Sequence, residues 1–265
     1  MWIHDMFGVQ KPIVALLHLD ALPGDPGFCG SVDAVLNHAG EDLRALQDGG
    51  VDGILFANEF SLPYQPVADI ATISTMAYII GSLKSELKIP YGVNVVKNPI
   101  ATIELGAATG AKFGRSCFSG AYMGEYGLYA SNSGEAVRRR KALEIQDFKL
   151  LFKVNPEADT YLVHRDVKVV AKSIMFGGFA DGLCVSGFMA GGDAPYEQLI
   201  DVKKAVGDFP VVANTGVKFD NVRRILEIAD ACCVATCLKV DGNANNPIDV
   251  NNVRKMMACA TEGKD

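Results

Sequence analysis

Short apolar segments recur along the chain, and a stretch with apolar residues at helical spacing follows each of them. The segments are rich in Val, Ile, Leu and Ala and contain few polar positions, a pattern typical of parallel strands that are buried on both faces. They follow one another about every 30 residues, which is the length of one βαβ unit. We predict strands over residues 12–18, 53–57, 91–96, 112–115, 149–154, 182–185, 210–213 and 232–235.

A helix is predicted after each strand. Ser31 is a suitable N-cap for the first of these helices, and Gly49 with Gly50 is a suitable stop. The fourth strand is separated from its helix by a long loop, residues 116–132. We predict helices over residues 31–48, 67–87, 100–109, 134–145, 165–176, 196–206, 220–228 and 250–259.

The repeated βα units predict the fold class. No Pro- or Ser-rich linker divides the 265 residues, so a single α/β domain over residues 1–265, a (β/α)8 TIM barrel, fits in number and in size. The alternative is an open doubly wound sheet of the dinucleotide-binding type, which requires a G-x-G-x-x-G turn after an early strand. Gly106, Gly110 and Gly114 have the wrong spacing for that turn, and no predicted strand precedes them. We therefore predict the closed barrel.

Polar side chains stand where the apolar strands end. In a barrel the C-terminal ends of all strands open onto one face, and catalytic residues lie there. Each polar residue alone could be a cap or a hydrogen-bonding group of the core, but together they predict a polar ring around one mouth. These residues are His18, Asn58, Glu59, Asn94, Arg115, Lys153, Asn155, Ser186, Asn214, Thr215, Thr236 and Lys239.

The loops after the last two predicted strands favour a phosphate site. Gly216 follows the seventh strand and lets the backbone approach a ligand closely, while the eighth strand ends at Thr236. Loops at these two positions of a barrel commonly hold phosphate through main-chain N–H groups, and Lys239 would add a point charge. Asp241 could hold a ligand hydroxyl or belong to a tight turn. Ordinary turn chemistry is the alternative for both loops.

Three charged residues are candidates for catalysis. Glu59 directly follows an apolar strand, where partial burial would suit it for proton transfer; a salt bridge to Arg115 is the alternative. Arg115 is suited to holding a carboxylate or a phosphate in bidentate fashion. Lys153 lies within the apolar run LLFKV, so it could form a Schiff base with a carbonyl group or pair with a neighbouring acid.

The long loop of residues 116–132 is predicted to bind substrate or to close over it, because long connections in compact domains often act as lids. It carries Tyr122, Tyr126 and Tyr129 among several glycines. The tyrosine rings could stack on a sugar or a base, or they could anchor the loop to the barrel rim.

Composition excludes several classes of protein. A net charge of −6 argues against a broad nucleic-acid surface, and the basic run at residues 138–141 is interpreted as a solvated helix face. The first residues, MWIHDMFGVQKP, do not resemble a signal peptide, and no apolar stretch is long enough to cross a bilayer, so a cytoplasmic protein is expected.

The seven cysteines are scattered and are expected to be free thiols of a reducing compartment. Cys232 and Cys233 are adjacent and would point to opposite faces of a strand, so they cannot hold one metal ion together. No metal and no cofactor are expected.

Several segments carry a family resemblance: HLDALPGDP, GGVDGILFANEFSLPY, YGVNVVKNP, GAKFGRSCFSGAYMGEYG, ADGLCVSG, PVVANTGVKFDNV and VATCLKVDGNANNPIDVNNVRKMM. Through them nearly the whole chain resembles the BtpA/SgcQ family. The resemblance implies a (β/α)8 barrel of the phosphate-binding type, with either a role in photosystem I biogenesis or an activity as a nucleosidase or sugar-metabolism enzyme. By the same resemblance, the family's recurring rim positions are His18, Asn58, Asn94, Arg115, Gly187, Gly216, Thr236 and Lys239.

Two segments depart from the family pattern. After the fifth strand the chain reads FKVNPEAD, where the family implies an acid and a histidine followed by valine, lysine and histidine. After the second strand it reads Asn-Glu-Phe-Ser, where an Asn-Phe-Gly-Asp type of run is usual. These departures indicate a subgroup with another substrate.

The sequence leaves two candidate functions. The first is an enzyme for a phosphorylated sugar or nucleoside-like small molecule. In it Glu59 transfers a proton or activates water, and Arg115 and Asn94 polarise the reacting oxygen. Hydrolysis of an N-glycosidic bond and isomerisation or aldol cleavage of a sugar phosphate both stay open. The second is a non-catalytic assembly or stability factor for a membrane complex, which requires an exposed apolar patch or a basic helix. A homo-oligomer is the expected assembly, without nucleic acid or membrane insertion.

Overall fold

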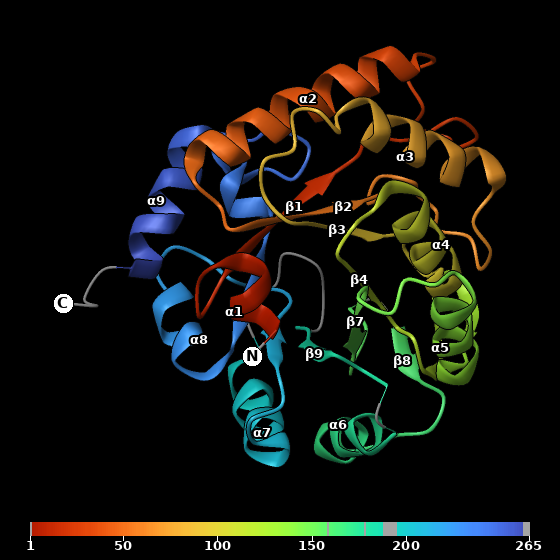
Figure 1. Ribbon diagram of the computed structural model, residues 1–265, viewed down its shortest axis with the longest axis vertical. Helices are drawn as coiled ribbons and strands as arrows, with labels where there is room; N and C mark the ends of the chain where they lie inside the picture. Colours follow the sequence, from red (N-terminus) through yellow and green to blue (C-terminus); the bar gives the residue numbers. More distant parts are fainter. Residues whose placement is uncertain (1, 158, 178, 188–194, 262–265) are drawn as a thin grey trace.

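The computed structural model of the protein describes residues 2–157, 159–177, 179–187 and 195–261. Within them, parallel strands close into a barrel in the order β1-β11-β10-β9-β7-β4-β3-β2, and helices surround it (Figure 1). This confirms the (β/α)8 barrel. The barrel strands are β1 Ile13–His18, β2 Gly53–Ala57, β3 Tyr91–Asn94, β4 Phe113–Ser116, β7 Lys149–Lys153, β9 Gly182–Val185, β10 Val211–Ala213 and β11 Ala231–Val234.

The first helix after β1 begins and ends where the local sequence predicts. The Ser31 hydroxyl accepts a hydrogen bond from the main-chain N–H of Ala34 (3.2 Å), and Gly50 takes the left-handed conformation that ends the same helix (φ 88°). The predicted helix at residues 67–87 was too long at both ends. The helices are α2 Val32–Gly49, α3 Ile70–Ser82, α4 Pro99–Thr109, α5 Ser133–Ala142, α6 Val167–Phe176, α7 Tyr196–Val206, α8 Val222–Ile228 and α9 Val250–Thr261.

The segment predicted as a loop, residues 116–132, contains a β-hairpin instead. Strands β5 Gly120–Gly124 and β6 Gly127–Ser131 pair antiparallel, and β8 Asp159–Tyr161 joins them from the loop that follows β7. The three strands form a small sheet outside the barrel. Two separate βα loops are therefore joined by main-chain hydrogen bonds.

Apolar residues form one layer outside the barrel and one inside it. The larger core lies between strands and helices, and the smaller core fills the barrel with side chains such as Leu16, Phe113 and Leu151. A Cβ atom on Gly92 would lie 2.4 Å from the Phe113 ring, so the missing side chain at Gly92 makes room for that phenylalanine.

A short N-terminal helix, α1 Trp2–Phe7, was not predicted from the sequence. Trp2, Met6 and Phe7 pack against the inner apolar core, and the Phe7 and Phe113 rings meet edge to face with centroids 5.8 Å apart. Figure 1 shows α1 lying across the ring of strands. The helix thus covers the end of the barrel opposite the polar mouth described below.

Candidate active site

A polar layer begins where the inner apolar core ends. Side chains two residues apart on a strand lie on the same face. The next side chain that points into the barrel therefore comes two residues after the last one of the inner apolar core. For β4 and β7, these positions are Arg115 after Phe113 and Lys153 after Leu151. The two strands are staggered, so that Arg115 pairs with Leu151. The full inward layer reads His18, Ala57, Asn94, Arg115, Lys153, Ser186, Asn214 and Ala235.

A cavity of about 1770 Å³ opens above this layer, at the C-terminal ends of the strands. Ser186 is buried and does not line the cavity. The residues of the polar layer that do line it are His18, Asn94, Arg115, Lys153, Asn214 and Ala235.

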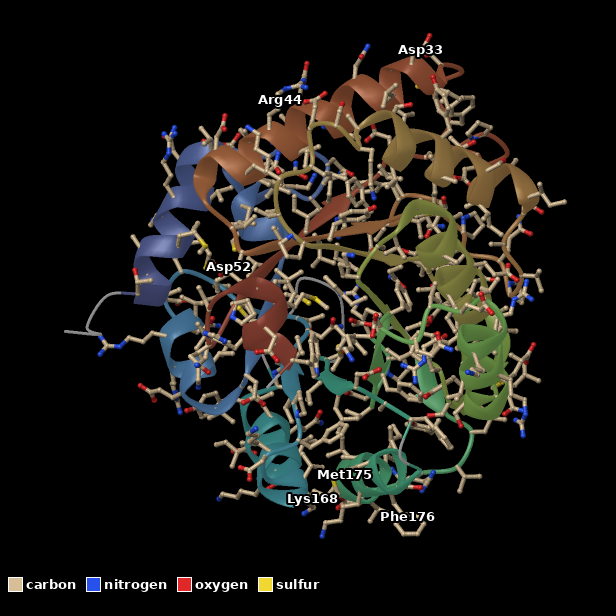
Figure 2. The ribbon with its side chains drawn as sticks, viewed as in Figure 1. Asp33, Arg44, Asp52, Lys168, Met175 and Phe176 are labelled. Carbon is tan, nitrogen blue, oxygen red and sulfur yellow. The ribbon has the colours of Figure 1, made fainter. Side chains whose placement is uncertain are left out.

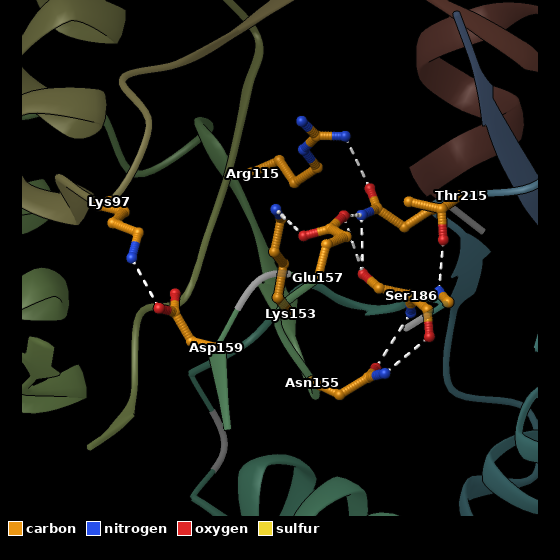
Figure 3. A network of polar contacts seen from close by, with 10 residues as sticks. Lys97, Arg115, Lys153, Asn155, Glu157, Asp159, Ser186 and Thr215 are labelled. Atoms are coloured by element: carbon orange, nitrogen blue, oxygen red, sulfur yellow. Dashed lines mark hydrogen bonds and ion pairs between the residues drawn. The ribbon is translucent and has the colours of Figure 1, made fainter. Parts of the chain in front are cut away.

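An ion pair with its supporting hydrogen bonds forms the centre of the floor (Figure 3). The Lys153 ammonium lies 2.8 Å from Oε2 of Glu157, and these side chains are 14% and 15% exposed. The other oxygen of Glu157 accepts from Asn214 Nδ2 (2.5 Å) and from the Ser186 hydroxyl (3.1 Å). The Asn214 side-chain oxygen in turn accepts from the Arg115 guanidinium (2.7 Å). Both Glu157 oxygens are therefore held in place.

The ion pair fixes the charges of its two members. Burial alone would lower the pKa of Lys153, but the Glu157 carboxylate outweighs it and raises that pKa above its ordinary value. Burial alone would raise the pKa of Glu157, yet Lys153 and then Arg115 hold it below its ordinary value. Near neutral pH the floor therefore contains a carboxylate beside an ammonium group.

His18 and Arg115 keep unused hydrogen-bonding capacity. Burial, with smaller contributions from Lys239 and Arg115, lowers the pKa of His18 to about 4, although Glu59 opposes the shift. The imidazole is therefore neutral at pH 7. In the described part of the chain, His18 Nδ1 and Arg115 Nε are buried and have no hydrogen-bond partner. The Asn94 amide lies against Arg115 and can donate to its main-chain oxygen (2.6 Å) and accept from its guanidinium (3.3 Å).

The loops after β10 and β11 form one side of the mouth. Gly216 takes a left-handed conformation (φ 75°), which a glycine adopts without strain. The Thr215 hydroxyl accepts a hydrogen bond from the main-chain N–H of Gly187 and thereby ties this loop to the end of β9. A 3₁₀ turn, η1 Thr236–Leu238, directly follows β11. The cavity lining from these loops comprises Gly187, Thr215, Gly216, Val217, Lys218, Thr236 and Cys237.

The small antiparallel sheet forms the other side. Tyr122 and Tyr129 are buried and anchor the hairpin to the rim. Tyr126 and Tyr129 line the cavity, and the Tyr126 ring meets the Tyr64 ring with centroids 5.2 Å apart. Lys97 Nζ lies 2.7 Å from Asp159 Oδ1 and 4.8 Å from the centre of the Tyr126 ring. Lys97 has a positive φ of 60°, which is uncommon for a residue other than glycine. The sheet is thus locked to the barrel by a second lysine–carboxylate pair.

Comparison with known proteins places the chain in a family. A model of the BtpA family matches residues 9–262. The chain belongs to the BtpA family.

Two relatives show how far the sequence similarity extends along the chain. The sgc region protein SgcQ of Escherichia coli (strain K12) is 44% identical over 258 residues, which are 97% of this chain and 96% of that protein. The photosystem I biogenesis protein BtpA of Synechocystis is 29% identical, over 99% of this chain and 92% of that protein. Their similarity to this chain spans the whole barrel.

Solved structures support the barrel fold at much lower identity. A phosphoribosyl anthranilate isomerase from Thermococcus kodakaraensis superposes with a TM-score of 0.55 at 15% identity and covers 96% of this chain and 100% of that one. A native KDPGal structure gives a TM-score of 0.56 at 14% identity, over 96% and 95% of the two chains. These matches show a shared TIM-barrel fold.

Three of the predicted site residues, Asn58, Glu59 and Asp241, differ in how they relate to the cavity. Asn58 is buried, and its side chain accepts from the main-chain N–H of Val96 (2.8 Å), so it joins two loops and does not line the cavity. Glu59 lines the cavity, but no salt bridge to Arg115 occurs in the described part of the chain. Asp241 sits in a tight turn with a positive φ of 56° and does not line the cavity, which fits the turn alternative.

Lys239 does not fit the predicted role of a phosphate partner. Its side chain is only 1% exposed, and Nζ donates to the main-chain oxygen of Asn246 (2.9 Å) and lies 3.9 Å from Asp42 Oδ2. It does not line the cavity. Because β11 ends at residue 234 and η1 turns the chain away from the barrel axis, the side chain of Lys239 packs behind the rim.

The sequence prediction missed Glu157, whose contacts dominate the floor. The signal was present: after Lys153 the chain reads Val-Asn-Pro-Glu, so a carboxylate stands four residues beyond the inward lysine. This segment is also where the chain departs from the expected family pattern.

Three further features concern the adjacent cysteines, possible metal ligands and membrane-spanning helices. Cys232 belongs to the outer core and Cys233 to the inner core, on opposite faces of β11. No group of three or more His, Cys, Asp or Glu side chains suited to a metal ion occurs in the described part of the chain. Among the helices of the described residues, none combines the length and apolar character needed to cross a bilayer.

Proposed function

We propose that this protein is an enzyme acting on a phosphorylated sugar or nucleoside-like molecule by acid–base chemistry at the floor of the barrel. The observation that carries this proposal is the Lys153–Glu157 ion pair, which is enclosed at the bottom of the cavity and held by Asn214 and Ser186. Perturbed carboxylate and lysine groups in a cleft are a common property of active sites.

The loops after β10 and β11 are the proposed phosphate site. Gly216 brings the main chain to the cavity wall, and the first residues of η1 lie beside it, which matches the usual phosphate site of barrel enzymes. Lys218 lines the same wall and takes the place of Lys239 as the proposed cation of this site.

Glu157 and Lys153 are the proposed proton-transfer groups. Glu157 is ionised at neutral pH and can accept a proton from a carbon or hydroxyl of the sugar, and Lys153 can return one to the neighbouring oxygen. This favours isomerisation or carbon–carbon cleavage over imine formation, because Lys153 is held in its ammonium form. Glu59 lines the same cavity and is the second candidate base.

A thermal-shift screen with inorganic phosphate, sugar phosphates and nucleosides tests the proposal, followed by NMR detection of turnover for each compound that binds. A ligand at 100 times its dissociation constant stabilises by roughly 2.7 kcal/mol, which is a clear shift in melting temperature. Glu157→Gln should keep ligand binding and lose turnover, while Glu104→Gln, on an exposed carboxylate that pairs with Arg139, should change neither. Absence of a shift with every phosphorylated compound would contradict the proposal.

The second candidate function, an assembly factor, is favoured by one surface. On α6, Val169 and Phe176 are 54% and 92% exposed and lie seven residues apart, two turns along one side of the helix. Figure 2 shows Phe176 at the outer edge of the molecule. If this surface carries the function, Phe176→Ser should abolish the cellular role and Glu157→Gln should leave it intact. The enzyme proposal expects the reverse.

A further inference from the structure

We propose that Arg115 and His18 form a second anion-binding subsite, at the floor of the cavity, which takes a carboxylate of the substrate. The inference rests on the proposed function in one respect: the same substrate molecule carries the phosphate held at the rim. It adds a substrate class, namely phosphorylated carboxylic acids.

The first reason is an unmatched buried charge. Arg115 is 4% exposed, and in the described part of the chain its guanidinium forms no salt bridge. Its hydrogen-bond partners are the neutral amides of Asn214 and Asn94 and the thiol of Cys233. Buried charges are normally paired, because removing an ion from water costs several kcal/mol when no counter-ion replaces the solvent. At the floor, Arg115 and Lys153 are two cations beside the carboxylate of Glu157, and Glu59, which lines the same cavity, acts on Arg115 without forming a salt bridge to it.

The second reason is the pair of unused nitrogen atoms. Arg115 Nε and His18 Nδ1 are both buried without a partner, and both side chains line the cavity. The Arg115 charge also contributes, as the smallest cause, to the lowered pKa of His18. Two donors suit the two oxygens of one carboxylate: Nε–H of Arg115 for one and His18, in its Nδ1–H tautomer, for the other.

The third reason is the size of the cavity. At about 1770 Å³ it exceeds the usual range of roughly 300–1,000 Å³ for a small-molecule site. A ligand held only by phosphate at the rim would leave the floor unfilled. A carboxylate at the floor extends the ligand from the Gly216 loop to the barrel axis and presents its central carbons to Lys153 and Glu157.

Calorimetric titration of the full chain with matched probes tests the subsite. The probes are methyl phosphate, then phosphoglycolate, 2-carboxyethyl phosphate and 3-carboxypropyl phosphate, each compared with its carboxamide. A charge-assisted contact should make at least one carboxylate bind roughly tenfold or more tighter than its own amide. If every carboxylate binds no better than its amide, the subsite is refuted.

Variants of Arg115 and His18 test whether these residues cause the preference for carboxylate over amide. Arg115→Gln should remove the preference for carboxylate over amide and leave the affinity for methyl phosphate unchanged, while Arg138→Gln, on an exposed arginine of α5, should keep both. His18→Asn should reduce the preference and serves as the deciding variant if Arg115→Gln does not fold. A preference that survives in the folded variants overturns the assignment to these residues.

The outcome separates this proposal from the preceding one. If no phosphate compound binds, the proposed function fails, and glycolate and pyruvate are then titrated against glycolamide and pyruvamide. Saturable binding of the acids that is lost in Arg115→Gln supports the floor subsite by itself. Equal behaviour of acids and amides rejects it.

Discussion

At the scale of single residues, His18 links the cavity to the pH dependence of stability. Its pKa is about 4 in the folded protein against 6.5 in the unfolded chain, so below pH 6.5 the unfolded chain binds a proton that the folded chain does not. The stabilising contribution is complete above pH 6.5 and is lost as the pH falls toward 4, by about 3 kcal/mol. Urea titrations at several pH values should show this loss in the wild type and much less of it in His18→Asn.

His38 contributes to the pH dependence of stability with the opposite sign. The hydrogen bond that His38 Nδ1 donates to the Asp20 carboxylate raises the pKa of His38, although burial opposes it. The stabilising contribution of His38 is therefore present at low pH and is lost as the pH rises through its folded pKa. The two histidines therefore act in opposite directions. A wild-type curve identical in shape to the His18→Asn curve between pH 4 and 6.5 would contradict the assigned shift.

The Lys153–Glu157 pair predicts a second effect at this scale. Lys153→Met leaves the Glu157 carboxylate in a largely enclosed position without its cation, which should destabilise the fold by about 2–3 kcal/mol, somewhat less than for a fully buried pair because both groups keep some exposure. The double variant Lys153→Met/Glu157→Gln should recover a large part of this loss. Denaturant unfolding of the wild type, the two single variants and the double variant measures it, and additive losses would show that the pair is not coupled.

How far single residues could be predicted depends on strand regularity. The inward residues Arg115, Lys153 and Asn94 follow from alternation along an apolar strand, so the sequence places them at the mouth. Glu157 lies in an irregular segment, where no period fixes the direction of a side chain. The predicted position of Lys239 at the mouth was wrong for the same reason. The 3₁₀ turn after β11 breaks the alternation on which that prediction relied.

At the scale of elements, the loop after β10 allows a direct test of the phosphate proposal. Gly216→Ala should cost about 1 kcal/mol, because a residue with a Cβ is strained at a φ of 75°, and should weaken inorganic phosphate binding as the main chain shifts. Gly50→Ala is the matched control: φ is 88° at the end of α2, and nothing lies within 4 Å of the added Cβ. The control should lose similar stability in a melting experiment and keep phosphate binding. Equal phosphate affinity in both variants would exclude the Gly216 loop from the site.

The small antiparallel sheet shows why elements outside the repeat are hard to predict. β5 and β6 have five residues each and β8 has three, and their glycines and tyrosines also suit a loop. The pairing of β5 with β8 joins segments that lie 35 or more residues apart, so no local pattern reports it. The anchoring alternative fits Tyr122, which is fully buried and stacks on the Tyr129 ring with centroids 5.8 Å apart, whereas Tyr126 and Tyr129 line the cavity and can contact a ligand.

At the scale of the whole molecule, the barrel could be predicted because its units repeat. Eight strands buried on both faces leave a continuous apolar signal, and closure follows from their number and from the chain length. Helix α1 has six residues and belongs to no repeat, so its role depends on packing that appears only once the barrel has closed. The two ends of the barrel thereby differ: an apolar cover lies at one end and a polar mouth at the other.

This division predicts that stability and binding can be separated. Phe7 packs edge to face on Phe113 at the covered end, far along the barrel axis from the Gly216 loop. Phe7→Ala should lower the free energy of unfolding by about 2 kcal/mol, less than for a fully enclosed phenylalanine because Phe7 is partly exposed. Because the Phe113 ring supports the strand that carries Arg115 two residues later, the decisive measurement is phosphate affinity at a temperature where both proteins are fully folded. Unchanged affinity supports a rigid polar layer that is independent of the cover, and a parallel loss of affinity would show that α1 helps to position the floor.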